Sequence, residues 1–168
     1  DSDTTSFSDS EQAAIGEIWS RVSEKYSPFN INVTTVEPAS LQDRVALKII
    51  IGGSGSWLGV AAGGVASRGS FTQSFSSNIA FVFPDQLGRN AKFVAEATAH
   101  EAGHVIGLSH QSLWSGTTRI TEYNPGNSLR APIMGNSYSA ARGTWSLGAV
   151  PASSTFIQDD LAIITSVE

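Results

Sequence analysis

Residues 100–110 read HEAGHVIGLSH and contain all three histidines of the 168-residue chain. Their four-residue spacing places His100 and His104 on one face of a helix, so both imidazoles can reach a common point. Gly107 allows the backbone to leave the helix with a positive φ angle, and the chain can then bring His110 to the same point as a third nitrogen ligand. The stretch therefore predicts a helix that ends at a three-histidine metal site.

Three protein ligands leave a fourth tetrahedral position open for water, which is the arrangement of a catalytic zinc rather than a structural one. Glu101 directly follows the first ligand, where it can act as general base on that water without being a ligand. HExxH alone also occurs by chance in helices, but HExxHxxGxxH fixes five identities at set spacing. The pattern predicts one catalytic zinc ion held by His100, His104 and His110, with Glu101 as the catalytic base.

This pattern resembles the zinc signature of the metzincin metallopeptidases. Those enzymes also carry a methionine in a tight turn beneath the metal. The only methionine of this chain, Met134, lies downstream of the third histidine and has proline and glycine close by in residues 131–135. A single methionine is otherwise a flexible core filler. Its position and its flanks favour the Met-turn.

Among metzincins the chain looks most like the matrixins, the matrix metallopeptidase group, on residues 98–110, 131–138 and 158–161. The resemblance implies that Tyr138, four residues after the methionine, belongs to the wall of the S1′ specificity pocket. Plain packing is the competing interpretation of this tyrosine. The resemblance also implies that Asp159 and Asp160 tie the last helix to neighbouring backbone. Ordinary stabilisation of a helix start by acidic side chains is the alternative for both.

In some metzincins a tyrosine two residues after the methionine binds zinc, but this chain has Asn136 there, so no tyrosine ligand is expected. The resemblance further places the strand before the zinc helix at the edge of the sheet, antiparallel to its neighbours, where it pairs with extended substrate. Residues 76–81 would then form the upper rim of the cleft. The expected substrate pocket comprises Tyr138, Asn136, Ile79 and Ala80.

Several features depart from the matrixin pattern. With no fourth histidine, a second, structural zinc cannot be built from imidazoles, and no Asp/Gly-rich calcium loop precedes residues 76–81, so calcium binding is left open. The 23 residues between His110 and Met134 form a longer linker than in matrixins. These differences indicate a divergent, bacterial relative.

Hydrophobic periodicity outlines the remaining elements. Ser8 and Glu11 have the spacing of a capping box ahead of an amphipathic helix that ends near residue 27. Asn90 is the expected N-cap of the zinc helix, which runs to about residue 107. Strands are expected at residues 29–35, 45–51, 58–65 and 79–83, with 45–51 at the sheet centre, and residues 153–155 are expected to cap a final helix.

The resemblance implies an α+β fold, the α/β-type metzincin fold. It has a twisted, mostly parallel sheet with an antiparallel edge strand, two long helices, and a small irregular C-terminal subdomain that ends in a helix. We expect a single catalytic domain over residues 1–168. Its upper subdomain would cover about residues 8–110 and its lower subdomain about residues 111–168.

Composition limits the possible partners. A net charge of −5 argues against binding to a phosphate backbone, so no nucleic-acid partner is expected. No apolar run approaches the length of about 18 residues that would suggest a membrane span. The chain has no cysteine, which excludes a thiol nucleophile and a Cys-ligated metal. We expect a monomer, secreted or at the cell surface, acting on protein or peptide substrates, with a propeptide or further domains possible in a longer chain.

The sequence thus predicts a zinc-dependent endopeptidase that hydrolyses internal peptide bonds, with Glu101 taking a proton from the attacking water and returning it to the departing amine. The alternative is a metzincin-like zinc-binding domain of a larger surface protein, acting as a binding or adhesion module with little or no peptidase activity. The unusual linker leaves room for that alternative, whereas an intact Glu101 argues against it.

Overall fold

The computed structural model describes residues 5–59 and 61–167, and its first element is the predicted amphipathic helix, α1 (Asp9–Tyr26). The capping box is present in both directions: the Ser8 backbone N–H donates to Glu11 Oε2 at 2.8 Å, and the Glu11 N–H donates to the Ser8 hydroxyl. The helix buries Val22 and Tyr26 against the core. Local sequence therefore sets both the start of α1 and the face that it buries.

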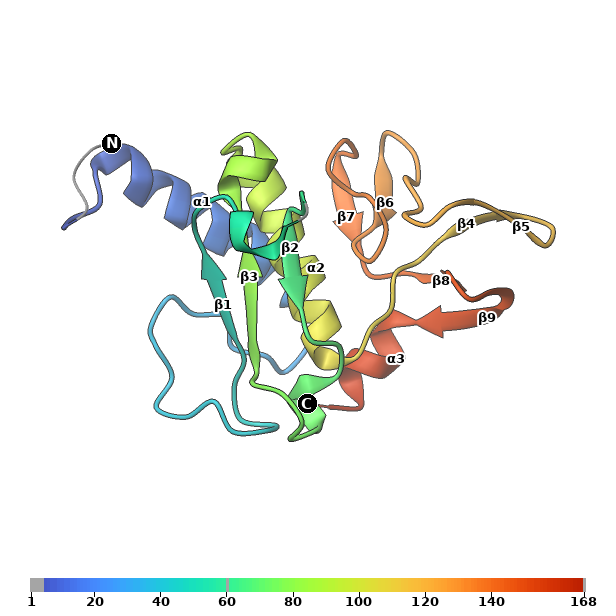
Figure 1. The fold of residues 1–168 in the computed structure, drawn as a ribbon, viewed down its shortest axis with the longest axis horizontal. Coiled ribbons are helices and arrows are strands. Elements are labelled where there is room, and N and C mark those ends of the chain that lie inside the picture. Colours follow the sequence, from blue (N-terminus) through green and yellow to red (C-terminus); the bar gives the residue numbers. More distant parts are fainter. Residues whose placement is uncertain (1–4, 60, 168) are drawn as a thin grey trace.

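A three-stranded sheet stands in front of the helices in Figure 1, with the order β1-β3-β2. β1 (Lys48–Ile51) runs parallel to β3 (Ile79–Val82), and β2 (Gly64–Ala66) runs antiparallel to β3. An antiparallel edge strand is present, as expected, but it is β2 rather than the strand that precedes the zinc helix. β3 occupies the middle of the sheet, so the expectation that residues 76–81 form the rim was wrong.

Two further strand predictions also need correction. Residues 45–51 were expected at the sheet centre, yet β1 is an edge strand in which Ile50 and Ile51 are 38% and 40% exposed. Residues 29–35 form no strand, although their apolar members pack against the core and the Trp19 indole donates to the Val33 carbonyl at 2.9 Å. The alternating hydrophobicity of this segment reflects side chains that pack on the core from one side of the chain. Among the described strands, none pairs with its backbone.

Helix α2 (Ala91–Ile106) packs between α1 and the three-stranded sheet, with most of its residues buried. The Asn90 side chain caps it by accepting from the Phe93 N–H at 3.2 Å, as the sequence predicted. Gly107 ends it at a φ of +132°, a conformation that side-chain-bearing residues rarely adopt. The chain then crosses to the C-terminal part of the molecule, which lies on the other side of α2 from the sheet (Figure 1).

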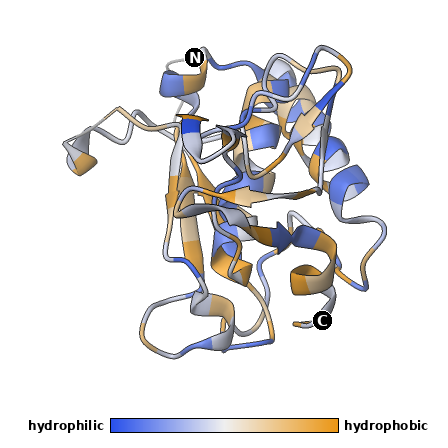
Figure 2. Cartoon of the chain, turned by 90° about the vertical axis from the view of Figure 1, so that its right-hand side faces the viewer, coloured by the Kyte–Doolittle hydropathy of each residue, from blue (hydrophilic) through white to orange (hydrophobic). Residues whose placement is uncertain are grey.

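The C-terminal part consists of three two-stranded sheets and a short helix. The short helix, α3 (Asp160–Thr165), does not begin near residues 153–155 as expected. Residues 153–159 instead form a strand that pairs with residues 147–150. Helix α3 buries Ile164 completely and is largely hydrophobic in Figure 2, next to the C-terminus. The elements of this C-terminal part are β4 (Leu113–Ser115), β5 (Thr118–Thr121), β6 (Arg130–Pro132), β7 (Arg142–Thr144), β8 (Leu147–Val150), β9 (Ser153–Asp159) and α3 (Asp160–Thr165).

Within residues 5–59 and 61–167 the fold is thus a mixed α+β arrangement of three α-helices and small sheets. Short 3₁₀ turns connect several elements, at Ser56–Leu58, Ser70–Thr72 and Pro84–Leu87. The strand expected over residues 58–65 is confirmed only at its end, by β2, and its position 60 lies outside the described residues. None of the described helices is both long and apolar enough to cross a membrane. The division into two subdomains stays a prediction.

Candidate metal centre

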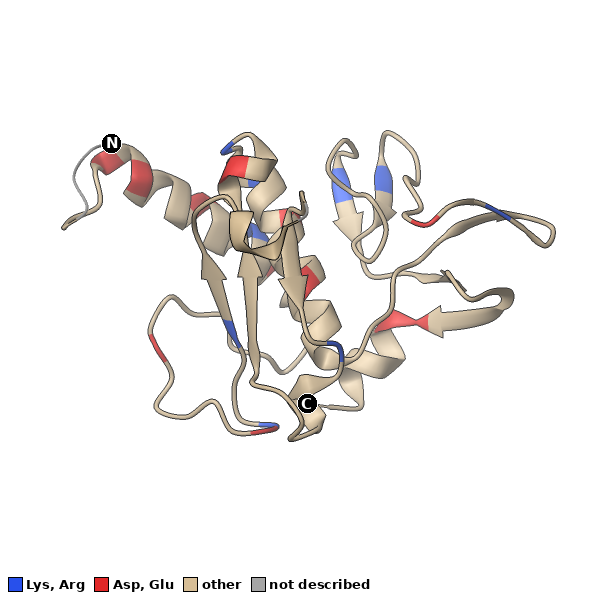
Figure 3. Cartoon of the chain, viewed as in Figure 1, with Lys and Arg blue, Asp and Glu red and all other residues tan. Residues whose placement is uncertain are grey.

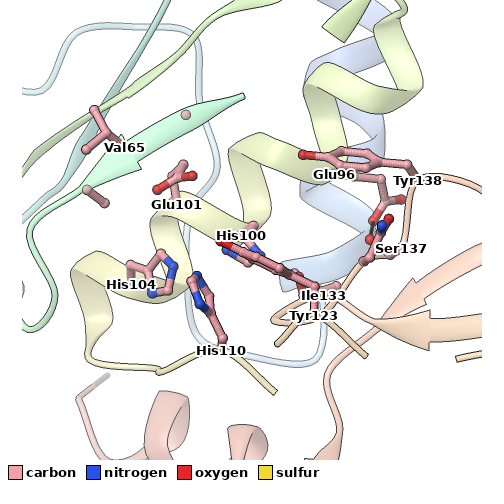
Figure 4. Close-up of a pocket in the computed structure, with 14 residues that line it drawn as sticks. Val65, Glu96, His100, Glu101, His104, His110, Tyr123, Ile133, Ser137 and Tyr138 are labelled. Carbon is pink, nitrogen blue, oxygen red and sulfur yellow. Dashed lines mark hydrogen bonds between the residues drawn. The ribbon is translucent and has the colours of Figure 1, made fainter. Parts of the chain in front are cut away.

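The three histidines meet beside the C-terminal end of α2. His100 and His104 lie one turn apart on the helix, with ring centroids 4.6 Å apart. After the turn at Gly107, the His110 ring comes within 5.2 Å of the first ring and 4.8 Å of the second, measured between centroids. One nitrogen from each ring lies within 4.8 Å of the others, and Figure 4 shows the rings turned toward a common point. The three residues can hold a metal ion.

Hydrogen bonds to the outer ring nitrogens determine which nitrogen faces the centre. His100 Nδ1 lies 2.7 Å from the Ile133 carbonyl oxygen, and His104 Nδ1 lies 2.8 Å from the Leu108 carbonyl oxygen. A carbonyl oxygen only accepts, so each Nδ1 must carry the hydrogen and each Nε2 keeps its lone pair. The tautomer that a metal requires is therefore set by the backbone around the cluster.

Electrostatics favour the same state. Burial lowers the pKa of His100 to about 3, with the neighbouring His104 adding to the effect, and burial lowers the pKa of His104 to about 4. Both imidazoles are consequently neutral at physiological pH, as ligation demands. Neutral imidazole nitrogens are preferred by zinc and by several other transition metals. The donor set fits a metal ion of this class.

Glu101 points toward the sheet side of the same cluster. Its side chain is buried, and burial raises its pKa to about 8. It packs directly against Gly64 of β2, where an added Cβ would come within 2.7 Å of Glu101 Oε1. The close approach of β2 to α2 thus depends on Gly64 having no side chain. This packing keeps the Glu101 carboxylate next to the histidines.

The histidines and Glu101 line a cleft of about 390 Å³. Residues 64–66 of β2 form one side, and the segment after Met134 forms the other, including Asn136 and Tyr138. That Asn136 and Tyr138 contact a substrate stays a prediction. Ile79 and Ala80 do not line the cleft, because β3 is the middle strand and Ala80 is fully buried. Their place at the rim is taken by β2.

Met134 is fully buried and packs on α2, the helix that carries His100 and His104. Its sulfur packs against Gly103, where an added Cβ would lie only 2.6 Å from Sδ. The Gln111 N–H donates to the Met134 carbonyl oxygen at 2.7 Å, which ties the turn to the residue after the third histidine. The role of Met134 as a floor under metal ligands stays a prediction.

Replacing Met134 by leucine tests this packing role. Because the two side chains have similar volumes, we expect the free energy of unfolding to fall by no more than about 1.5 kcal/mol. Metal binding should persist because the sulfur faces Gly103 rather than serving as a ligand. Urea denaturation and a zinc titration would measure both quantities. Loss of zinc binding by a folded Met134→Leu protein would contradict the assignment.

The two aspartates before α3 have different roles. Asp159 is the N-cap and accepts from the Ala162 N–H at 3.0 Å, which fits the helix-start interpretation. Asp160 is fully buried and accepts from Gln111 Nε2 at 2.9 Å and from the Ser146 N–H at 3.0 Å. Burial raises its pKa to about 6. Asp160 therefore anchors the helix to neighbouring backbone and to the residue after the third histidine.

Sequence reasoning missed two residues of the 111–133 linker that reach the cluster. His110 Nδ1 lies 2.8 Å from Glu122 Oε1, and the Tyr123 ring lies 4.4 Å from the His110 ring between centroids. Tyr123 also lines the cleft and extends across the histidines in Figure 4. Neither residue belongs to a motif or a periodic pattern, so only the three-dimensional path of the linker reveals them.

Glu122 should support metal binding through His110. A carboxylate that accepts from the outer nitrogen of a ligating imidazole orients the ring and raises its basicity. We expect Glu122→Ala to weaken zinc binding by about 10- to 100-fold, measured by competition with a chromophoric chelator. Glu122→Gln, which keeps an acceptor oxygen but no charge, should lie in between. The exposed Glu17, paired with Arg21 on α1, provides the control, and an equal effect of Glu17→Ala would refute the role.

No protein-family model matches this sequence, and no curated protein matches it either.

Proposed function

We propose that the protein is a zinc-dependent endopeptidase of the metzincin type, closest to the matrixins. One observation carries the proposal: three imidazoles with inward-facing Nε2 atoms stand beside a buried carboxylate in a cleft, in the sequence context HExxHxxGxxH. The buried Met134 below the cluster and Tyr138 in the cleft wall add support. The mixed α+β fold with an antiparallel edge strand is compatible with the metzincin fold.

A bound zinc ion would supply Lewis-acid activation of a water molecule and polarisation of the substrate carbonyl. The positive charge of the ion would favour the ionised form of Glu101. In that form Glu101 takes a proton from the attacking water on a carboxylate oxygen and passes it to the nitrogen of the departing amine. Its place against Gly64 holds the carboxylate on the β2 side of the cleft. Tyr123 lies over the histidines, where its hydroxyl can donate a hydrogen bond to the carbonyl oxygen as negative charge develops.

The cleft also provides a place for an extended substrate. β2 pairs with β3 on one side only, and residues 64–66 line the cleft. A peptide can therefore add to this edge as a further strand, using backbone hydrogen bonds for affinity. The edge strand brings the peptide bond past Glu101 because Gly64 touches that side chain.

The test combines metal content with turnover. We expect one zinc ion per chain by elemental analysis, and cleavage of a denatured protein substrate that stops with a chelator and returns when zinc is added. Cleavage sites inside the substrate, read by mass spectrometry, would identify an endopeptidase. One bound zinc without any cleavage of denatured substrates would instead favour a metzincin-like binding module. Cleavage that survives complete zinc removal would refute the proposal.

A further inference from the structure

A buried ion pair lies behind the cleft, one helical turn before the first histidine. Glu96 Oε1 accepts from Lys25 Nζ of α1 at 2.7 Å, and Glu96 Oε2 accepts from the Ser137 hydroxyl at 2.5 Å. The two charged side chains are only 9% and 4% exposed, the lysine first. Glu96 and Ser137 line the cleft, whereas Lys25 does not. Glu96 therefore borders the cleft with a largely buried side chain, and Lys25 lies outside the lining.

The segment after Met134, residues 135–138, forms the wall of the cleft next to this carboxylate, and contacts with α2 hold it in place. The Tyr138 ring packs on Phe93 of α2 with centroids 5.3 Å apart, and Lys92 Nζ donates to the Ala140 carbonyl oxygen at 2.5 Å. Figure 4 shows Glu96, Ser137 and Tyr138 grouped together, on the opposite side of His100 from His104. The recess between α2 and the wall thus has Tyr138 on one side and Glu96 at its inner end.

β7 closes the recess from behind. An added Cβ on Gly143 would lie 2.1 Å from Glu96 Oε2 and 3.0 Å from the Ser137 hydroxyl oxygen. A side chain at this position would displace the carboxylate or the strand, so the glycine lets β7 pack directly on the ion pair. The position of the carboxylate is consequently fixed by α1, α2, β7 and the wall together.

The chemistry of this recess selects what can enter it. A carboxylate offers about four acceptor sites, and Lys25 and Ser137 use two of them. An apolar group against Glu96 would bury the carboxylate further without offering it a hydrogen bond, which is unfavourable for a charged group. A donor would supply one, and a cationic donor would gain most. The part of the cleft lining that the structure describes has no Lys or Arg, while Glu101 adds a second carboxylate.

We propose that the recess beside Tyr138 is a side-chain pocket for a basic residue, lysine or arginine, next to the cleaved bond. Glu96 is its specificity-determining residue. This inference rests on the proposed peptidase function, since it assigns the side chain that the same cleft accepts. Basic residues are scattered over several elements of this protein (Figure 3). Among the described residues that line the cleft, none is a lysine or arginine that could compete for Glu96.

Hydroxamates that differ only in one side chain test the pocket independently of turnover, because they bind through the metal. Calorimetry on the zinc-loaded protein would compare compounds that carry a 4-aminobutyl, an isobutyl or a 2-carboxyethyl side chain, with acetohydroxamate as the reference for metal contact alone. We expect the amine to bind about tenfold more tightly than the isobutyl compound, and the acid to bind least tightly.

Two variants of Glu96 assign the preference. Glu96→Gln keeps the shape of the side chain and should reduce the preference for the amine to about threefold or less. The triple replacement Lys25→Met, Glu96→Leu and Ser137→Ala removes all three polar partners together, so no charge is left unpaired and the fold should survive. In that protein the isobutyl compound should bind more tightly than the amine.

Tighter binding of the isobutyl compound by the wild type would overturn the inference, as would an unchanged preference in the triple variant. Binding of all side-chain compounds no better than acetohydroxamate would overturn the pocket itself. These results leave the peptidase proposal standing wherever denatured protein is still cleaved in a zinc-dependent manner. Zinc binding without cleavage would remove the peptidase proposal alone, because hydroxamate binding reports on the pocket without turnover.

Discussion

Replacing Glu101 by glutamine will lower the proposed peptide cleavage by the zinc-loaded protein by about 10²- to 10⁴-fold, the usual contribution of a positioned acid–base group. The amide has nearly the shape of the carboxylate but cannot take a proton from the attacking water. The three histidines keep their backbone and side-chain partners, so one zinc ion per chain should remain. Single-turnover rates and elemental analysis of the same preparation would measure the two effects together.

The same replacement should make the metal-free protein more stable at alkaline pH. The folded chain holds a proton on Glu101 up to a pKa of about 8, whereas the unfolded chain releases it near the ordinary value of 4.5. Between these values the folded state binds more protons, so the free energy of unfolding falls as pH rises. Glutamine removes this loss. At about 1.4 kcal/mol per pKa unit, the advantage of the variant grows to about 4 kcal/mol near pH 8.

Thermal unfolding in a chelator at pH 5 and pH 8 would measure this advantage. Glu17→Gln, at an exposed position of α1, should show no growing difference between the two pH values and serves as the control. A Glu101→Gln protein that cleaves peptides at the wild-type rate would rule out the base. A metal-free variant that matches the wild type at both pH values would show that burial does not hold the proton on this carboxylate.

The replacement Lys25→Met will lower the free energy of unfolding by about 3–5 kcal/mol, because Glu96 is then left as an uncompensated buried charge. The exposed pair of Arg21 and Glu17 on the same helix provides the comparison, with side chains 41% and 48% exposed. Arg21→Met should cost less than about 1 kcal/mol, as exposed pairs usually do. Both replacements introduce the same methionine on α1, so burial of the partner is the main difference.

Urea unfolding would give both values. Adding Glu96→Leu and Ser137→Ala to Lys25→Met should restore most of the lost stability, because the set of polar groups is then removed as a whole. Equal costs for Lys25→Met and Arg21→Met would show that the pair is not desolvated. Failure of the combined variant to recover stability would show that the three polar groups are required for the packing around them.

The cluster of three histidines was predictable because most of its geometry is local. His100 and His104 are related by one helical turn, and Gly107 supplies the backbone change that returns His110. Met134 was placed from its position relative to this motif and from its flanking residues. Capping signals likewise predicted α1 and α2, since an N-cap and its partner lie within three residues of each other.

The supporting partners were not predictable, because they meet across large separations. Glu96 is 71 residues from Lys25 and 41 from Ser137, and no pattern around any of them differs from an ordinary solvated charge or a turn residue. Strand order failed for a related reason. Residues 45–51 and 79–83 are both short apolar runs, and hydrophobicity alone does not say which of them has a neighbour on each side.

The hydrogen bonds to the three outer ring nitrogens have a consequence for the lifetime of the protein. One acceptor lies just after α2, another lies beside Met134, and the third lies twelve residues beyond His110. An ion bound at the centre would act as a cross-link between α2 and the linker over residues 111–133. Without it, α2 stays packed between α1 and the sheet, whereas the linker loses an attachment and becomes easier to nick. Under the proposed peptidase function, copies that lose their metal would be cut by those that keep it, so metal supply would set the abundance of the protein.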